Sequence, residues 1–161
     1  MDSEYKIYLA RAQNELNLSM IVQKISDDKS IQVTLFGMKE DTYYIATISH
    51  AYYSIFYAAK AYLLLKGIKT EAPEEHRKTF EEFSKFVDQG VIDVELLKIY
   101  QSMLVKADTL LNIFVRERSK RGTFTYRRIP QANQEPARES INNAKVFFNN
   151  VYRLCEELNQ K

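Results

Sequence analysis

The longest apolar pattern in the chain runs from Thr42 to Gly67, TYYIATISHAYYSIFYAAKAYLLLKG. At helical spacing this stretch carries two adjacent apolar seams. The first consists of Tyr44, Ile48, Ala51, Ile55, Ala58, Tyr62 and Leu65, and the second of Ile45, Tyr52, Phe56, Ala59 and Leu63. The narrow polar edge that remains is formed by Thr47, His50, Ser54 and Lys60. A helix that is apolar around most of its girth belongs at the centre of a helical domain or inside a membrane.

The part of this stretch from Thr42 to Ala59 has no Lys, Arg, Asp or Glu and is about as long as a minimal membrane span. Its Tyr, Thr, Ser and His residues nevertheless recur through the middle of the run, whereas an interfacial belt would gather them at its ends. Unpaired polar groups are costly in hydrocarbon. We therefore expect a buried central helix from Tyr43 to Leu65 and no membrane association.

A first helix is expected before the central one, capped by Asp2 or Ser3 and ending near Ser26. The following run from Ile31 to Phe36, IQVTLF, is rich in β-branched residues, but no other stretch offers it a strand partner. We expect an extended connector there, which packs one of its apolar side chains against the core: Val33, Leu35 or Phe36.

Three further apolar stripes follow the central helix, which Gly67 is expected to cap. The first is short, begins near Pro73 and ends at Gly90. The second is capped by Asp93 and leads into a basic segment. The third opens at Pro136, with apolar residues three and four positions apart as in an antiparallel bundle. The pattern predicts an all-α fold, an up-and-down bundle of about five helices.

Composition supports one helical domain spanning residues 1–161. The chain is 45% hydrophobic and has only 4 Gly and 3 Pro, too few turn residues for an all-β fold of this length. With 1 Cys, no intrachain disulfide can form. The amino terminus lacks the apolar core of a signal peptide, so we expect a cytoplasmic protein. A net charge of +2 is too small to indicate nucleic-acid binding by itself, so the position of the charges matters more.

The charges are most one-sided between Arg116 and Arg128, RERSKRGTFTYRR. Six cations stand against Glu117, so six minus one gives +5: Arg116, Arg118, Lys120, Arg121, Arg127 and Arg128. Phe124 and Tyr126 are interleaved with them. Arginine suits phosphate and aromatic rings suit bases, so this basic segment favours binding of a nucleotide or an extended nucleic acid. The alternative is a solvated helix end whose cations offset the helix dipole.

Other chemistry has little support in the sequence. The 2 histidines, His50 and His76, lack Cys, His or carboxylate partners at ligand spacing, so no metal site is expected. We expect His50 to be a buried hydrogen-bonding group on the polar edge of the central helix, and His76 to be exposed. Cys155 lies on an apolar seam and is expected to pack in the core. No cofactor motif, phosphate-binding glycine loop or catalytic triad is recognisable, and no catalytic residue is assigned.

Two stretches together resemble the HEPN superfamily of small helical proteins. SHAYYSIFYAAKAYLLLKGIKT, from Ser49 to Thr70, is similar to the long family helix with its paired aromatics, alanines and leucine-rich end. KRGTFTY, from Lys120 to Tyr126, resembles the family's Arg-x4-6-His motif at the end of a later helix. Counted from Arg121, however, the position of the motif histidine holds Tyr126. Because tyrosine has an ordinary pKa near 10, it is a poor general base at neutral pH.

The resemblance therefore implies a binding protein more than a ribonuclease. It implies a homodimer that contacts a nucleotide or RNA and is partnered with a minimal nucleotidyltransferase in a toxin-antitoxin-like pair. The binding residues expected on this basis are Arg116, Arg118, Lys120, Arg121, Tyr126 and Arg127. Two alternatives stay open. One is a metal-independent endoribonuclease toxin in which Tyr126 or His50 replaces the missing base, and the other is a protein interaction module without nucleic-acid contact.

Overall fold

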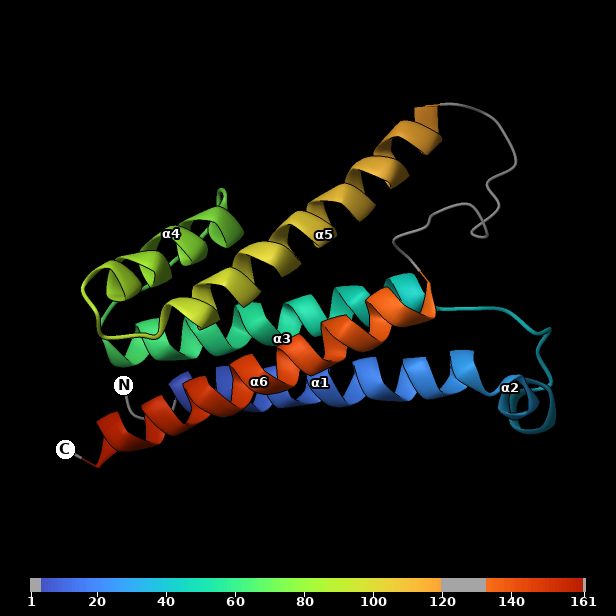
Figure 1. The fold of residues 1–161 in the computed structure, drawn as a ribbon, viewed down its shortest axis with the longest axis horizontal. Helices are drawn as coiled ribbons and strands as arrows, with labels where there is room; N and C mark the ends of the chain where they lie inside the picture. Colours follow the sequence, from blue (N-terminus) through green and yellow to red (C-terminus); the bar gives the residue numbers. More distant parts are fainter. Residues whose placement is uncertain (1–3, 120–132, 161) are drawn as a thin grey trace.

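The computed structural model describes residues 4–119 and 133–160, with the backbone alone for 111–119 (Figure 1). These ranges contain helices and no strand, which confirms the all-α fold. The helices are α1 (Glu4–Asp27), α2 (Lys29–Phe36), α3 (Tyr44–Leu65), α4 (Glu75–Asp88), α5 (Val94–Ser119) and α6 (Gln134–Asn159). None of the described helices combines the length and apolarity that a membrane crossing requires.

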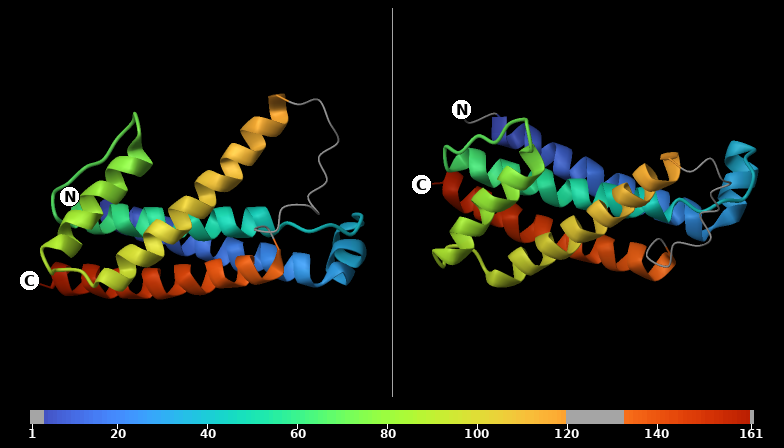
Figure 2. Two further views of the ribbon diagram at one scale, coloured as in Figure 1. Left: turned by 45° about the horizontal axis from the view of Figure 1, so that its top comes forward. Right: turned by 90° about the horizontal axis from the view of Figure 1, so that it is seen from above.

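Helix α3 is the centre of the bundle. It lies alongside α1 and α6, while α4 and α5 cover another of its sides (Figures 1 and 2). Its two apolar seams are buried except for Tyr44 and Leu65 at the helix ends, which are partly exposed. Three residues of the polar edge, Thr47, Ser54 and Lys60, are buried as well. The prediction of a buried central helix is therefore confirmed. Both apolar seams can be buried because neighbouring helices pack against nearly the whole circumference of α3.

The ends of the helices follow from local capping. Gly67 has a φ of 75°, in the left-handed region, and this lets the Ile68 N–H donate to the Leu63 carbonyl at 2.9 Å. At the start of α5, the Asp93 carboxylate accepts a hydrogen bond from the Glu95 N–H at 2.8 Å. Both caps agree with the expectation from sequence.

The segment from Ile31 to Phe36 is a helix, not the extended connector that its β-branched residues suggest. Asp28 caps α2 by accepting from the Ser30 N–H at 3.2 Å, and Gly37 ends it with a φ of 61°. These two caps outweigh a weak intrinsic preference for strand. The expected apolar contacts are also wrong, because the side chains are exposed to 49%, 74% and 53% at Val33, Leu35 and Phe36.

The buried residue of α2 is Gln32. Its Nε2 donates to the carbonyls of Ile25 and Asp41, each at 2.8 Å, and its Oε1 accepts from the Asp41 N–H at 2.8 Å. One amide thus joins the end of α1 to the connection that precedes α3. With α2 included, the described chain has six helices where about five were expected.

Helix α5 crosses the bundle at an angle, so that its C-terminal half rises away from α3 (Figure 2, left). The first turn of α1 and the last turn of α6 lie at one end of the bundle, and the end of α5 points toward the other (Figure 1). The fold therefore carries the chain toward the basic segment on a helix that leaves the packed core.

Candidate functional site

The predicted binding residues lie only partly within the described chain. Arg116 and Arg118 belong to the last turns of α5, where the backbone is described but the side chains are not. The other four, Lys120, Arg121, Tyr126 and Arg127, lie outside the described residues.

A cavity of about 210 Å³ lies between α3, α4 and α5, and we call it the α3–α5 cavity. Its lining comprises Ser49, Tyr52, Tyr53, His76, Leu104, Ala107 and Asp108. Three segments distant in the sequence contribute to it: two turns of α3, the first turn of α4 and the middle of α5. The lining combines aromatic rings, a carboxylate, a hydroxyl and an imidazole, a mixture typical of small ligand sites.

His76 is the most constrained polar group in this cavity. Its Nδ1 lies 2.8 Å from the Tyr52 hydroxyl. Its ring stacks on Phe56, with 4.0 Å between centroids and 18° between planes. The imidazole is half-buried, so the expectation that it is exposed is wrong. The first turn of α4 folds back onto α3, which the local sequence around His76 does not reveal.

The protonation of this pair follows from its surroundings. Burial lowers the pKa of His76, with Lys60 acting in the same direction and Glu75 and Asp108 opposing. Burial also raises the pKa of Tyr52. At neutral pH both groups are thus uncharged, and the hydroxyl that keeps its proton donates to Nδ1. This hydrogen bond leaves the ring proton of His76 on Nε2.

Several polar groups lining the cavity have no partner in the described part of the chain. The Asp108 carboxylate forms no ion pair there, and no hydrogen bond engages the Ser49 hydroxyl or Nε2 of His76. By contrast, many hydroxyls on the same helices donate to a backbone carbonyl one turn earlier, as Thr109 does to Val105 at 2.8 Å. The cavity therefore has unused hydrogen-bonding capacity.

Aromatic side chains continue from the cavity along α3. The ring of Tyr53 lies 6.1 Å from that of Tyr57, and Tyr57 in turn stacks with Tyr8 of α1 at 6.0 Å. The Arg11 guanidinium sits 4.4 Å from the centre of the Tyr57 ring, a cation–π contact. We call Tyr8, Tyr53, Tyr57 and Arg11 the aromatic strip.

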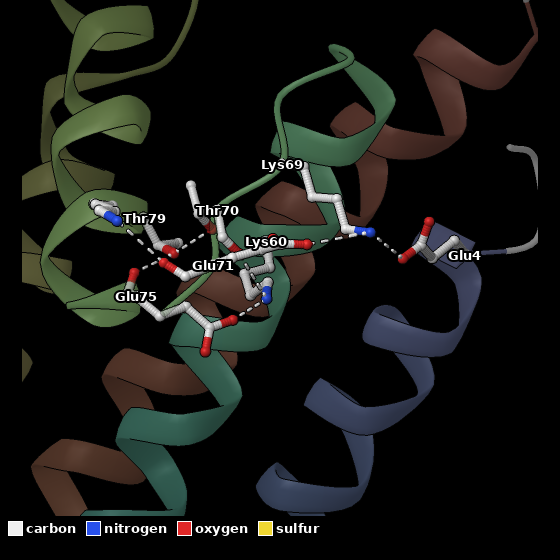
Figure 3. A network of polar contacts seen from close by, with 8 residues as sticks. Glu4, Lys60, Lys69, Thr70, Glu71, Glu75 and Thr79 are labelled. Atoms are coloured by element: carbon white, nitrogen blue, oxygen red, sulfur yellow. Dashed lines mark hydrogen bonds and ion pairs between the residues drawn. The ribbon is translucent and has the colours of Figure 1, made fainter. Parts of the chain in front are cut away.

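A buried polar cluster holds the first turn of α4 against α3 (Figure 3). The Lys60 ammonium donates to the Glu75 carboxylate and, at 3.3 Å, to the carbonyl of Thr70. Thr79 donates to the Glu75 carbonyl at 2.8 Å, so its oxygen accepts from the Thr70 hydroxyl at 2.7 Å. Because His76 follows Glu75 directly, this cluster also positions the imidazole in the cavity.

The remaining sequence candidates have structural surroundings of their own. His50 Nδ1 lies 2.6 Å from Glu15 Oε2, which agrees with the expected hydrogen-bonding role, but the imidazole is only partly buried, with 30% of the side chain exposed. Cys155 is buried as expected, and burial raises the pKa of its thiol to about 12. Within residues 4–119 and 133–160, no three His, Cys, Asp or Glu side chains are grouped to hold a metal ion.

Sequence reasoning alone did not identify the α3–α5 cavity. His76 and Asp108 lie on different helices and share no spacing that would connect them. One local signal was present: Asp108 is the one acidic residue between Glu95 and Glu117 in the sequence. An isolated carboxylate next to an apolar stripe is a reasonable candidate for a site.

The family model for the HEPN domain matches residues 37–157, which is most of the 161-residue chain. The chain belongs to the HEPN family. The match begins directly after α2 and includes α3, the α3–α5 cavity and the whole basic segment. No curated protein and no solved structure matches the chain. HEPN membership thus rests on the family model, and it agrees with the helical fold.

Proposed function

We propose that this HEPN protein binds a nucleotide or RNA through the basic segment, which begins in the last turns of α5. The residues that carry the binding are Arg116, Arg118, Lys120, Arg121, Tyr126 and Arg127. The observation that supports this most is the extent of the HEPN match, which includes the basic segment with its six cationic residues and one acidic residue. Arginine binds phosphate with a planar, bidentate fork, and Tyr126 offers a ring for stacking.

The course of α5 favours the same function. Helix α5 leaves the bundle toward its C-terminal end, and the basic segment begins in its last turns (Figure 2, left). A helix end that only offsets its own dipole needs one or two cations in its last turn. The basic segment has more charge than that role requires.

Replacement of three cations together tests the proposal. The variant Arg118→Ala/Lys120→Ala/Arg121→Ala is compared with Lys39→Ala/Lys85→Ala/Lys98→Ala, which removes the same charge from exposed positions elsewhere. Binding of a fluorescein-labelled pentauridylate is followed by anisotropy at several salt concentrations. We expect the first variant to bind more weakly and to flatten the salt dependence, by about 0.7 in slope for each lost phosphate contact.

The control variant should retain the wild-type salt slope. Equal loss in both variants would mean that net charge alone attracts RNA, and unchanged binding in the first would exclude the basic segment. Thermal unfolding of both variants should differ little from that of the wild type. A loss of stability of about 0.3 to 1 kcal/mol in the first variant, with unchanged RNA binding, would instead support a capped helix end.

We also propose that the protein acts as a homodimer beside a minimal nucleotidyltransferase in a toxin-antitoxin-like pair. Apolar side chains exposed near α2 give a dimer a surface to cover. A depression of about 650 Å³ there is lined mainly by apolar residues, including Met20, Ile21, Ile31 and Phe36. The partnership is tested by the neighbouring reading frames and by co-purification of a nucleotidyltransferase encoded there. Neighbours that encode no such enzyme would contradict it.

A further inference from the structure

We infer that the α3–α5 cavity binds one nucleobase, preferentially guanine, of the nucleotide or RNA strand whose phosphates contact the basic segment. The inference rests on the proposed function and adds the chemistry of the ligand's base. It concerns residues outside the basic segment: Ser49, Tyr52, His76 and Asp108.

The size and walls of the cavity suit a flat ring system. At about 210 Å³ it is smaller than sites for drug-sized ligands, which are roughly 300–1,000 Å³, so it has room for a base but not for a whole nucleotide. Tyr52, Tyr53 and His76 supply three rings, and Leu104 and Ala107 form the apolar side. Unpaired bases bind proteins by stacking on such rings and by hydrogen bonds at their edges.

The polar groups discriminate among the bases. An ionised carboxylate only accepts hydrogen bonds, and its two oxygens accept from two adjacent donors. Guanine presents such a pair, N1–H and the N2 amino group, whereas uracil flanks its single N3–H with two carbonyl oxygens that a carboxylate repels. The Ser49 hydroxyl and the Nε2–H of His76 are the remaining donors for the guanine carbonyl. All three protein groups are unpaired in the described chain.

The charge of Asp108 also determines where the phosphates lie, because a carboxylate repels them. Arg116 is eight residues further along α5, which at 1.5 Å per residue is roughly 12 Å along the helix axis. A strand with its base beside Asp108 can therefore extend toward the basic segment. In the opposite direction it meets the rest of the aromatic strip, where Tyr57 offers a further stacking surface and Arg11 a cation.

Oligonucleotide binding tests the base preference. Anisotropy is measured with fluorescein-labelled UUGUU, UUIUU and UUUUU, where inosine lacks the N2 amino group. The wild type should bind UUGUU about tenfold more tightly than UUUUU, as expected for one bidentate contact to a base, with UUIUU between them. Asp108→Asn should reduce this ratio to about one. The matched variant Glu95→Gln removes an equal charge from the exposed start of α5 and should keep the tenfold ratio.

Asp108→Asn also removes a charge that repels phosphate, which raises the affinity for all three strands by the same factor, in addition to the loss of the guanine contact in UUGUU. The ratio between strands is therefore the decisive quantity. A wild-type ratio near one, or a tenfold ratio that survives Asp108→Asn, would overturn the inference. Unfolding curves for both variants should match the wild type, since neither carboxylate is buried.

Free nucleotides separate this inference from the proposed function. The imidazole signals of His76 and His50, assigned with His76→Gln, are followed by NMR as GMP or UMP is added. GMP should shift the His76 signal and leave that of His50, which is paired with Glu15, unchanged; UMP should shift neither. If GMP shifts the His76 signal but no oligonucleotide binds, guanine binding in the α3–α5 cavity is supported. The ligand is then a free nucleotide, and the proposed RNA binding is contradicted. No response of His76 to GMP would exclude the cavity, even where oligonucleotides bind the basic segment.

Discussion

The Lys60 ammonium and the Glu75 carboxylate form a contact that joins α3 to the first turn of α4. Lys60 is almost inaccessible, with 7% of its side chain exposed, whereas 33% of Glu75 is exposed. Burial by itself lowers the pKa of Lys60, but its interactions with Glu75 and Tyr8 outweigh burial, and the net pKa is raised. This contribution to stability is therefore present below the ordinary value of 10.5 and is lost as the pH rises through the folded value.

Removal of Glu75 should destabilise the fold more than replacement of Lys60. Glu75→Ala leaves a buried ammonium with the Thr70 carbonyl and the Tyr8 ring, and we expect a loss of about 2–4 kcal/mol. Lys60→Met leaves a partly hydrated carboxylate and should cost less than about 2 kcal/mol. Urea unfolding measures both. Glu95→Ala, in the first turn of α5, controls for the loss of an acidic residue at a helix start. An equal or larger loss of stability in Lys60→Met would show that an unpaired Lys60 ammonium destabilises the fold no more than an unpaired Glu75 carboxylate.

Ile55 is completely buried in α3, so its truncation leaves a cavity on the most enclosed helix. Ile55→Ala should lower the free energy of unfolding by roughly 2–5 kcal/mol. Val105→Ala is the control, because Val105 is 59% exposed on α5 and should change stability by no more than about 0.5 kcal/mol. Denaturant unfolding at constant pH compares them. A similar, small effect at both positions would mean that Ile55 is not a core residue in solution.

Protonation of His76 should weaken the fold in mild acid. Burial lowers its folded pKa below the ordinary 6.5, so the unfolded chain binds more protons in this range. Stability is then fully present above pH 6.5 and falls as the pH decreases toward the folded value. The wild type should lose more stability between pH 7 and pH 5 than His76→Gln, which does not titrate. His50 is present in both proteins, so any contribution it makes to the pH dependence of stability is the same in both. Identical pH profiles would contradict a depressed pKa at His76.

A homodimer is expected at micromolar concentration. With 11 Tyr and 9 Phe, the chain has more aromatic residues than its core obviously requires, and α2 exposes Leu35 and Phe36. Sedimentation should show a species of about twice the 18.9 kDa chain. Leu35→Glu/Phe36→Glu should shift it toward monomer, while Val105→Glu on an exposed face of α5 should not. A wild type that sediments only as 18.9 kDa would rule out the dimer.

RNA cleavage is not expected from the wild-type protein. Tyr126 occupies the position of the family's motif histidine, and His50 already pairs with Glu15. Incubation of purified protein with several RNAs should leave them intact on denaturing gels. Cleavage that disappears in Arg121→Ala would overturn this expectation, and its loss in Tyr126→Phe with binding retained would assign the chemistry to the tyrosine.

The periodicity of the chain predicts most of the fold. A double apolar seam such as that of α3 has one low-energy location, between neighbours on all sides, so local pattern and tertiary position coincide. Gly67 and Asp93 were predictable for a similar reason, because a cap acts within four residues of its own position. The family motif was likewise visible, since it depends on residue types at fixed spacing.

Features that depend on long-range contacts were not predictable in this way. The buried position of Gln32 depends on partners in other segments, which its own sequence does not reveal. The β-branched residues of α2 were misleading because the caps at Asp28 and Gly37 outweigh their preference for strand. The position of His76 depends on how α4 folds back onto α3, where Lys60 contacts Glu75, fifteen residues further along the chain. The α3–α5 cavity was not predictable for the same reason, because its lining comes from α3, α4 and α5. The binding roles of Lys120, Arg121, Tyr126 and Arg127 stay predictions, because these residues lie outside the described chain.

The two ends of the described bundle have a practical consequence for measurement. The first turn of α1 and the last turn of α6 lie together, away from the end toward which α5 points (Figure 1). An affinity tag, a fluorophore or a tether to a sensor chip can therefore be attached at either terminus and remain far from the C-terminal turns of α5. Immobilisation through either end should give the same ligand affinities.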